Sequence, residues 1–316
     1  MRQTRWPLLL AALCLSQPAQ AQERTIRVIS GFAAGGASDL VTRLVAEAVS
    51  PILGARAVVE NRTGVNGVIA AAEVARSAPD GNTVYQCPMS TMAITPQLQG
   101  ANLPVDPGEA LAPIANLALS SYGFVVAGNG PYRSVADVLA AARSRAVVFG
   151  SAGVGSAQHL SGELLAQKAG VALTHVPYRG ATPAVVDILG GRTDFMITNL
   201  ADVSRQVQDG ALRLLAIGDA GRSSLFPDAP ALATLVPGFD VTGWFGLCGP
   251  RGLPAEVLSR WEAALRQALA DPALPKRLAE SGLTPLFEDA ATLGRRIAAD
   301  RALWRGVIAS VGVKAE

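Results

Sequence analysis

Residues 26–40 read IRVISGFAAGGASDL, and this stretch decides the kind of fold. It starts with a short apolar strand at residues 26–30 and runs into a glycine-rich turn at residues 31–38. A helix is expected next, because apolar side chains then recur every three or four residues. Ser38 or Asp39 is suited to cap the first turn of that helix. A strand, a tight turn and a helix in this order form the repeating unit of an α/β fold.

The same order recurs through the first two thirds of the chain. Further strands are expected at residues 57–60, 83–86, 147–149, 173–176, 193–198 and 212–218. Helices are expected at residues 68–76, 134–143, 157–169, 183–189 and 201–208. This alternation predicts parallel sheets that are covered by helices.

The C-terminal part of the chain has a different pattern. One strand-like run, residues 241–248, precedes three expected helices at residues 254–270, 272–281 and 290–311. The first of these helices has an apolar stripe made of Leu258, Trp261, Leu265 and Leu269. We expect the stripe to pack on the first sheet, because one apolar face is typical of a surface helix.

Two strand-like segments, residues 114–126 and 239–247, bracket the middle of the chain. The simplest topology leaves the first domain near residue 122 and returns to it near residue 242. Domain 1 would then contain residues 22–122 and 242–316, and domain 2 would contain residues 123–241. Two such crossovers form a hinge, and the crevice between two hinged lobes is a natural ligand site.

The N-terminus has the features of a secretory signal peptide. Arg2 and Arg5 precede an apolar run at residues 8–15, and Ala19-Gln20-Ala21 is a cleavage signal. The run is shorter than the roughly 20 residues that a membrane helix needs. We therefore expect residues 1–21 to be removed, and the mature chain to be soluble and periplasmic.

Charge and composition exclude several classes of function. Only 16% of the 316 residues are charged, against 50% that are hydrophobic, which excludes a disordered chain. Removal of residues 1–21 takes away two of the 27 basic residues and no acid, which leaves 25 bases and 25 acids. A neutral chain without a basic block disfavours nucleic-acid and anionic-membrane binding. Two histidines and no CxxC motif predict no metal site. No cofactor is expected.

Cys87 and Cys248 both end apolar, strand-like runs. Buried positions favour two free thiols, whereas export permits a disulfide. The sequence does not set their separation, so both interpretations stay open.

Two glycine-rich loops lie between a strand and a helix, at residues 32–39 and 150–156. Free backbone N–H groups at a helix start favour an anion such as a carboxylate. Neither loop has the spacing of a dinucleotide fingerprint or a P-loop. Each loop alone is explained by an ordinary turn, but one in each half of the chain favours two lobes that hold one small anion.

A third loop, residues 175–183, reads HVPYRGATP. Arg179 is able to offer two hydrogen bonds to a carboxylate, or to lie on the surface as a solvated charge. His175 and His159 are expected to be structural, because two histidines without a matched nucleophile make a poor catalytic set. Side chains that follow other strand ends are further candidates for the pocket, or serve in turns and packing: Met89, Ser90, Thr91 and Asn199.

In this order the loops resemble those of the extracytoplasmic solute receptors of tripartite tricarboxylate transporters, the Bug-type periplasmic binding proteins. The matching stretches are residues 35–39 (GGASD), 59–64 (VENRTG) with Gly67, 78–81 (APDG), 150–156 (GSAGVGS) with His159-Leu160, 175–180 (HVPYRG), 189–191 (LGG) with Asp194, and the C-terminal residues 304–316. The resemblance covers the whole mature chain. It departs from the family at Ala33-Ala34 and at Thr63, where prolines are usual.

The resemblance implies a two-lobed periplasmic-binding-protein fold, type II-like, with two α/β domains joined by a two-strand hinge. It implies a non-enzymatic receptor that captures a small carboxylate by lobe closure and delivers it to membrane transporter subunits. The mature chain is expected to be a monomer. The implied ligand-binding residues are Gly35, Gly36, Ala37, Ser38 and Asp39 in the first lobe, and Ser151, Ser156, Arg179, Gly180 and Ala181 in the second.

Two rival functions stay open on the sequence alone. The chain is also suited to be a ligand sensor for a signalling partner. An exported hydrolase would use Ser151 or Ser156 with His159, although no acid–histidine–serine spacing is visible. The role of Asp39 also stays open between a helix cap, which we favour, and a contact to a ligand amine.

Overall fold

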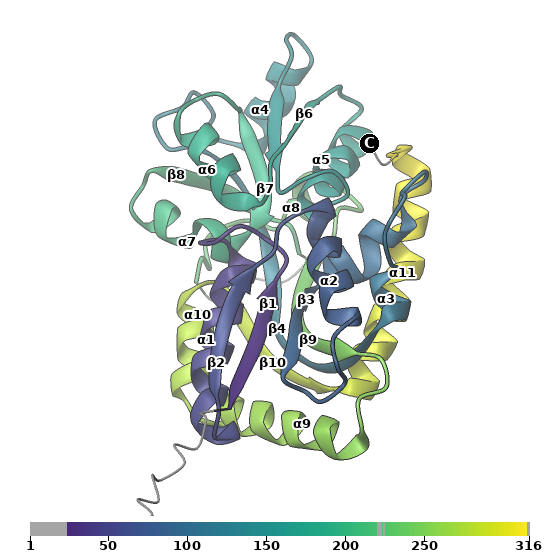
Figure 1. The fold of residues 1–316 in the computed structure, drawn as a ribbon. Helices are drawn as coiled ribbons and strands as arrows, with labels where there is room; N and C mark the ends of the chain where they lie inside the picture. Colours follow the sequence, from purple (N-terminus) through teal and green to yellow (C-terminus); the bar gives the residue numbers. More distant parts are fainter. Residues whose placement is uncertain (1–23, 220–222, 224, 315–316) are drawn as a thin grey trace, which may run out of the picture.

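The computed structural model of the chain describes residues 24–219, 223 and 225–314. The predicted signal peptide, residues 1–21, lies outside the described residues. Two lobes stand one above the other in Figure 1, and both are built from strands with helices packed over them.

The first lobe is built on β1 (Thr25–Ser30), β2 (Arg56–Asn61), β3 (Thr83–Pro88), β9 (Thr242–Pro250) and β10 (Leu283–Asp289). Strand β1 lies between β2 and β3 and pairs parallel with both. Strand β9 pairs antiparallel with β3. The carboxyl ends of β1 and β3 thus point to one edge of this sheet, which is the edge that faces the second lobe (Figure 1).

The second lobe is built on β5 (Val148–Ser151), β6 (Thr174–Pro177), β7 (Phe195–Asn199) and β8 (Leu212–Ile217). Its helices are α4 (Val135–Ala142), α5 (Ala157–Ala169), α6 (Ala181–Leu189) and α7 (Leu200–Gln208). Strand β5 pairs parallel with β6 and β7.

One long strand, β4 (Leu111–Ala127), belongs to both lobes. Its first part, Leu111 to Ser121, pairs with β9. Its last part, Tyr122 to Ala127, pairs antiparallel with β7 and with β8. The chain returns to the first lobe through β9, so β4 and β9 carry the two connections. We propose the domain boundaries near residues 122 and 242 on this basis.

The prediction of parallel sheets is right for β1, β2 and β3 and for β5, β6 and β7, but it is wrong elsewhere. Strands β4, β8, β9 and β10 all pair antiparallel. Apolar periodicity along one segment carries no information on the direction of its neighbour, because strand direction depends on the connections. Strand β10 was not expected at all. It interrupts its apolar run with Pro285 and ends on two acids, Glu288 and Asp289.

The remaining helices are α1 (Ala37–Leu53), α2 (Val68–Ala75), α3 (Pro107–Ala110), α8 (Leu232–Leu235), α9 (Ala255–Ala270), α10 (Ala273–Glu280) and α11 (Ala290–Val311). Short turns of other helix types cover Val65–Gly67, Ser90–Ile94 and Thr95–Gln97. Helix α11 crosses the boundary between the lobes (Figure 1), where Gln167 of α5 donates a hydrogen bond of 2.7 Å to the carbonyl of Ser310.

The predicted apolar stripe of α9 is confirmed. Trp261 and Leu265 are completely buried and belong to one apolar cluster with Ile26 and Val28 of β1. Leu258 and Leu269 pack at the edge of the same cluster. Burial of a side chain as large as Trp261 contributes about 1.5–3 kcal/mol or more to the free energy of folding.

A disulfide joins Cys87 of β3 to Cys248 of β9, with the two Cα atoms 5.9 Å apart. The alternative of two free buried thiols is therefore wrong. The physical reason is the antiparallel pairing of β3 with β9, which brings Tyr85 opposite Cys248 and Cys87 opposite Gly246. The sequence separation of 161 residues concealed this pairing.

Candidate functional site

Hydrogen bonds to the carboxylate of Asp39 fix the conformation of the turn between β1 and α1. This carboxylate accepts hydrogen bonds from the N–H of Gly35 at 3.0 Å, from Asn61 at 2.9 Å and from Arg43 at 2.9 Å. These three donors hold the pKa of Asp39 below its usual range, although burial alone would raise that pKa. Gly36 occupies the N-cap position and supplies no side-chain cap, so the prediction that Ser38 or Asp39 is the N-cap is wrong: both lie inside the first turn of α1. Asp39 thus shapes the turn at the helix start, with its carboxylate fully occupied.

The corresponding turn of the second lobe is built around serines. Ser156 caps α5 by accepting a hydrogen bond of 3.1 Å from the N–H of His159. Ser151 is completely buried and accepts a hydrogen bond of 3.1 Å from the N–H of Gly153. Its hydroxyl also lies 2.6 Å from Nε2 of His175. Both serines therefore support the turn from inside the lobe.

The third loop brings the lobes together. Gly180 has a φ of 123°, and a Cβ atom at that position would lie 3.0 Å from Cβ of Ala33 in the first lobe. In the first turn of α6, the hydroxyl of Thr182 donates a hydrogen bond of 3.1 Å to the carbonyl of Ala34 in the first lobe. Glycine at position 180 therefore permits both the backbone conformation and the close approach of the two lobes.

Each lobe also offers a helix N-terminus to a side chain of the other lobe. The N–H of Ala37, in the first turn of α1, donates a hydrogen bond of 2.6 Å to Oδ1 of Asp202 in α7. The N–H of Ala157, in the first turn of α5, donates one of 3.1 Å to the hydroxyl of Ser90. The first N–H groups of a helix have no partner within the helix and carry its positive dipole end. The two lobes are thus locked in contact by reciprocal hydrogen bonds.

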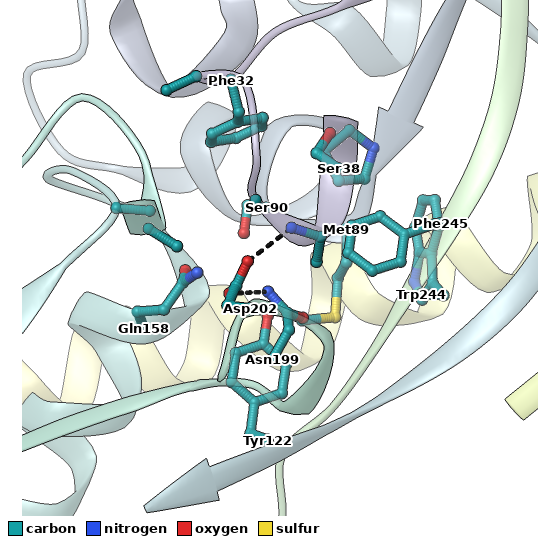
Figure 2. Close-up of a pocket in the computed structure, with 16 residues that line it drawn as sticks. Phe32, Ser38, Met89, Ser90, Tyr122, Gln158, Asn199, Asp202, Trp244 and Phe245 are labelled. Carbon is teal, nitrogen blue, oxygen red and sulfur yellow. Dashed lines mark hydrogen bonds between the residues drawn. The ribbon is translucent and has the colours of Figure 1, made fainter. Parts of the chain in front are cut away.

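A small cavity of about 30 Å³ lies between the lobes at this contact (Figure 2). In this closed arrangement the space is that of roughly one water molecule, so a larger solute needs the two lobes to move apart. Sixteen residues line it, eleven from the first lobe and five from the second: Phe32, Ala33, Gly36, Ala37, Ser38, Pro88, Met89, Ser90, Tyr122, Trp244 and Phe245, and then Ala152, Gln158, Ala181, Asn199 and Asp202.

Apolar rings form one part of the cavity wall, and polar groups form another. In the view of Figure 2, Asp202 lies between Gln158 on one side and Trp244 and Phe245 on the other. The Trp244 indole N–H donates to Asp300, so that the ring offers the cavity no N–H group. A ligand with an apolar body and a polar end would match this division.

Asp202 is the one carboxylic acid among the sixteen lining residues, which include no Lys, Arg or His. Burial removes its hydration and raises its pKa above the usual range, and hydrogen bonds from Thr198, Ala37 and Asn199 oppose that rise only in part. No ion pair joins Asp202 to any basic residue that the structure describes. The cavity therefore contains an acid without a counter-charge.

Gln158 is a second polar side chain of the cavity, and it has no hydrogen-bond partner among the described residues. The residue as a whole is 5% exposed. Its amide atoms are not among the fully buried ones, so they are open to the cavity, where a ligand group is able to pair with them.

A larger groove opens next to the cavity and shares Phe32 and Ala152 with it. Its lining includes the residues of the turn at 63–67 and, from the second lobe, residues 153–154 and 177–179. Arg179 is exposed and lines this groove rather than the cavity.

The predicted ligand-binding residues are divided between the cavity, the adjoining turns, the interior of the second lobe and the groove. Gly36, Ala37, Ser38 and Ala181 line the cavity. Gly35, Asp39 and Gly180 shape the adjoining turns, Ser151 and Ser156 lie inside the second lobe, and Arg179 lies in the groove. Of the further candidates, Met89, Ser90 and Asn199 line the cavity, whereas Thr91 bonds to Asn66 and Tyr85. A direct contact of any of them with a ligand stays a prediction.

Sequence reasoning missed Asp202, Gln158 and the three rings Phe32, Trp244 and Phe245. Asp202 and Gln158 lie in the first turns of α7 and α5. A polar residue at the start of a predicted helix was the sequence signal by which they could have been found. Trp244 and Phe245 lie in β9, whose return to the first lobe places them opposite α7.

The contact between Ser151 and His175 has the separation of a nucleophile and a base, but its surroundings do not suit catalysis. The ring of His175 stacks on that of His159 with centroids 3.7 Å apart. Burial, and next the neighbouring His159, lower the pKa of His175 to about 3. Ser151 is completely buried and does not line the cavity, so a substrate in the cavity would not reach its hydroxyl.

Among the described residues, no group of three or more His, Cys, Asp or Glu side chains comes together as a metal site. No helix of that part of the chain is long and apolar enough to cross a membrane.

Comparison with known proteins identifies the family. The sequence model of the tripartite tricarboxylate transporter family receptor matches residues 41–313. A UPF0065 protein of Bordetella bronchiseptica is 35% identical over 280 residues, which cover 87% of this chain and 82% of the relative. The protein BugT of Bordetella pertussis is 31% identical, with 92% of this chain and 90% of the relative covered.

Solved structures show the same fold. Rpa4515 of R. palustris with adipate has a TM-score of 0.89 and 30% identity, and the match covers 93% of this chain and 99% of that one. MatC of Rhodopseudomonas palustris with bound malate has a TM-score of 0.84 and 27% identity, over 90% of this chain and 99% of that one. The expected two-lobed, type II-like fold is confirmed, and it is a fold of binding proteins. The chain belongs to the Bug-type receptors of the tripartite tricarboxylate transporter family.

Proposed function

We propose that this chain is a periplasmic receptor that captures a small carboxylate-bearing solute in the cavity between its lobes and delivers it to a tripartite tricarboxylate-type transporter. The single observation that carries the proposal is the cavity itself, which is bounded by both lobes at the N-terminus of α1. Family membership and the adipate and malate of two similar structures support the ligand class.

The carboxylate of the solute would bind at the first turn of α1. The N–H groups of Ser38 and Asp39 make no hydrogen bond with the described residues, and they lie at the positive end of the helix dipole. Such a site attracts an anion without a basic side chain, which agrees with a lining that contains no Lys, Arg or His.

Lobe closure would couple binding to delivery. The solute touches residues of both lobes only in the closed arrangement, so it stabilises that arrangement relative to an open one. A transporter that recognises surfaces of both lobes together would then distinguish loaded from empty receptor. Export to the periplasm follows from the predicted signal peptide and from the family.

A thermal-shift screen of the purified, ligand-stripped chain tests the proposal. The panel contains mono-, di- and tricarboxylates, amino acids and nicotinate-like acids, together with their uncharged amides as controls. A solute at a hundredfold excess over its Kd should add about 2.7 kcal/mol to the free energy of unfolding. If no acid raises the melting temperature more than its amide does, the carboxylate proposal is wrong.

A further inference from the structure

Asp202 places a partly buried carboxyl group at the place where a carboxylate ligand is proposed to bind. Its Oδ1 accepts the N–H of Ala37, and its Oδ2 accepts hydrogen bonds from Thr198 and, at 3.2 Å, from Asn199. The acid is therefore held in a fixed position by donors from both lobes. A group held in this way selects its ligand, because a mismatched ligand leaves it buried and unpaired.

The charge balance of the cavity decides which ligand fits. A dicarboxylate would bring two further negative charges beside Asp202, and none of the lining residues carries a positive charge. Burial of several like charges together is strongly unfavourable. A ligand with one carboxylate and one ammonium group would instead place the carboxylate at the N–H groups of Ser38 and Asp39 and the ammonium at Asp202.

Gln158 provides the second observation. Its amide lines the cavity, has no hydrogen-bond partner among the described residues and faces the same space as Asp202 in Figure 2. An amide carries both donors and an acceptor, so it is able to serve either end of a zwitterion.

We propose that Asp202 is a specificity-determining residue that accepts a hydrogen bond from an ammonium group, so that this receptor takes an amino-bearing carboxylate in preference to a dicarboxylate. The inference rests on the proposed function and names the class of its ligand. The ion pair replaces the hydration that the Asp202 carboxylate loses on burial. The apolar body of the ligand lies against Trp244 and Phe245.

A matched set of four-carbon acids tests the inference by calorimetry and thermal shift. The set consists of butanoate, succinate, 2-aminobutanoate and 4-aminobutanoate, followed by the same comparison among the hits of the broader screen. In the unchanged protein an amino-bearing acid should bind at least tenfold more tightly than the plain acid and the diacid of equal length.

Asp202→Asn is the decisive variant, since it keeps the shape and the acceptor for Ala37 but removes the charge. It should weaken the amino-bearing acid about tenfold or more and strengthen the diacid. Asp209→Asn is the matched control: this exposed acid follows α7 outside the cavity and should leave the ranking of ligands unchanged.

A second variant keeps the test informative if Asp202→Asn folds poorly. Gln158→Met should weaken the binding of every ligand without changing the preference among them, and it breaks no hydrogen bond of the folded chain. The inference is overturned if the diacid or the plain acid binds the unchanged protein most tightly, or if Asp202→Asn leaves the ranking as it was. Those outcomes overturn only the role of Asp202 in specificity, and the proposed function as a carboxylate receptor is unaffected. If no acid of either panel binds, the proposed function fails as well.

Discussion

Gly180 shows at the scale of one residue how the chain allows its lobes to meet. Its φ of 123° is unfavourable for any side chain, and its Cα faces Ala33 across the interface. The motif around it was recognisable in the sequence, but its partner was not, because the two residues are far apart in the chain. Contact across an interface adds a second requirement for glycine beyond its backbone conformation.

Replacement of Gly180 by alanine should therefore weaken ligand binding. The strained φ costs about 1–2 kcal/mol of folding free energy, and the contact with Ala33 disfavours the closed state, so affinity should fall about fivefold or more. Gly191→Ala is the control, because Gly191 has a φ of 70° and no atom within 4 Å of an added Cβ. Calorimetry and urea unfolding of both variants separate the two effects. Equal losses of affinity in both would contradict the interface role.

The disulfide acts at the scale of the elements, because it fastens β3 to β9. Strand β3 ends at the cavity wall with Pro88, and β9 supplies Trp244 and Phe245 to the same wall. The bond closes a loop that contains the whole second lobe. The disulfide therefore joins a strand that precedes the second lobe in the chain to the strand by which the chain returns from it, and both strands contribute to the cavity wall.

Replacement of both Cys87 and Cys248 by alanine should lower the free energy of unfolding by about 2–5 kcal/mol. The loss follows from the larger conformational freedom of the unfolded chain without the bond. Urea unfolding of the unchanged protein with a reductant should reproduce the loss, and the reductant should have no effect on the variant. Two reactive thiols in the urea-unfolded, unreduced protein would show that the bond is absent, since both cysteines are completely buried in the folded chain.

The whole molecule is held closed by a small number of polar contacts between the lobes. Besides the two helix N-termini, Asn66 donates a hydrogen bond of 3.0 Å to the carbonyl of Gly155, and Thr182 donates to Ala34. Contacts of this kind each contribute about 0.5–1.5 kcal/mol. Their sum is modest, which suits a receptor that must open again to release its solute.

Thr182→Val should shift the balance of the whole molecule toward the open state. The variant keeps the shape of the side chain and removes the hydroxyl that reaches Ala34, so ligand affinity should weaken about two- to tenfold through a population shift. Thr234→Val is the matched control, since the hydroxyl of Thr234 bonds to Ala231 within one segment. Small-angle scattering should show a larger mean radius for Thr182→Val only. An unchanged affinity would mean that this contact does not favour closure.

Most elements could be predicted from the sequence because their causes are local. The bounds of α5 and α11 agree with the predicted helices, since a serine or an aspartate cap and a following glycine mark their ends. The turn at residues 31–36 was likewise recognisable. Strand β10 was missed, because a proline and acids conceal a strand that long-range pairing with β4 stabilises.

The sequence by itself determined an α/β chain with a glycine-rich turn before a helix in each lobe, because strand and helix periods and turn residues act over a few neighbours. Only the tertiary structure decided the antiparallel pairing of β3 and β9, the disulfide that follows from it, and the meeting of Asp202 with the N–H of Ala37. The physical reason is that these contacts join residues more than 150 positions apart. Their formation depends on how the chain leaves and re-enters the first lobe, and no local pattern records that path.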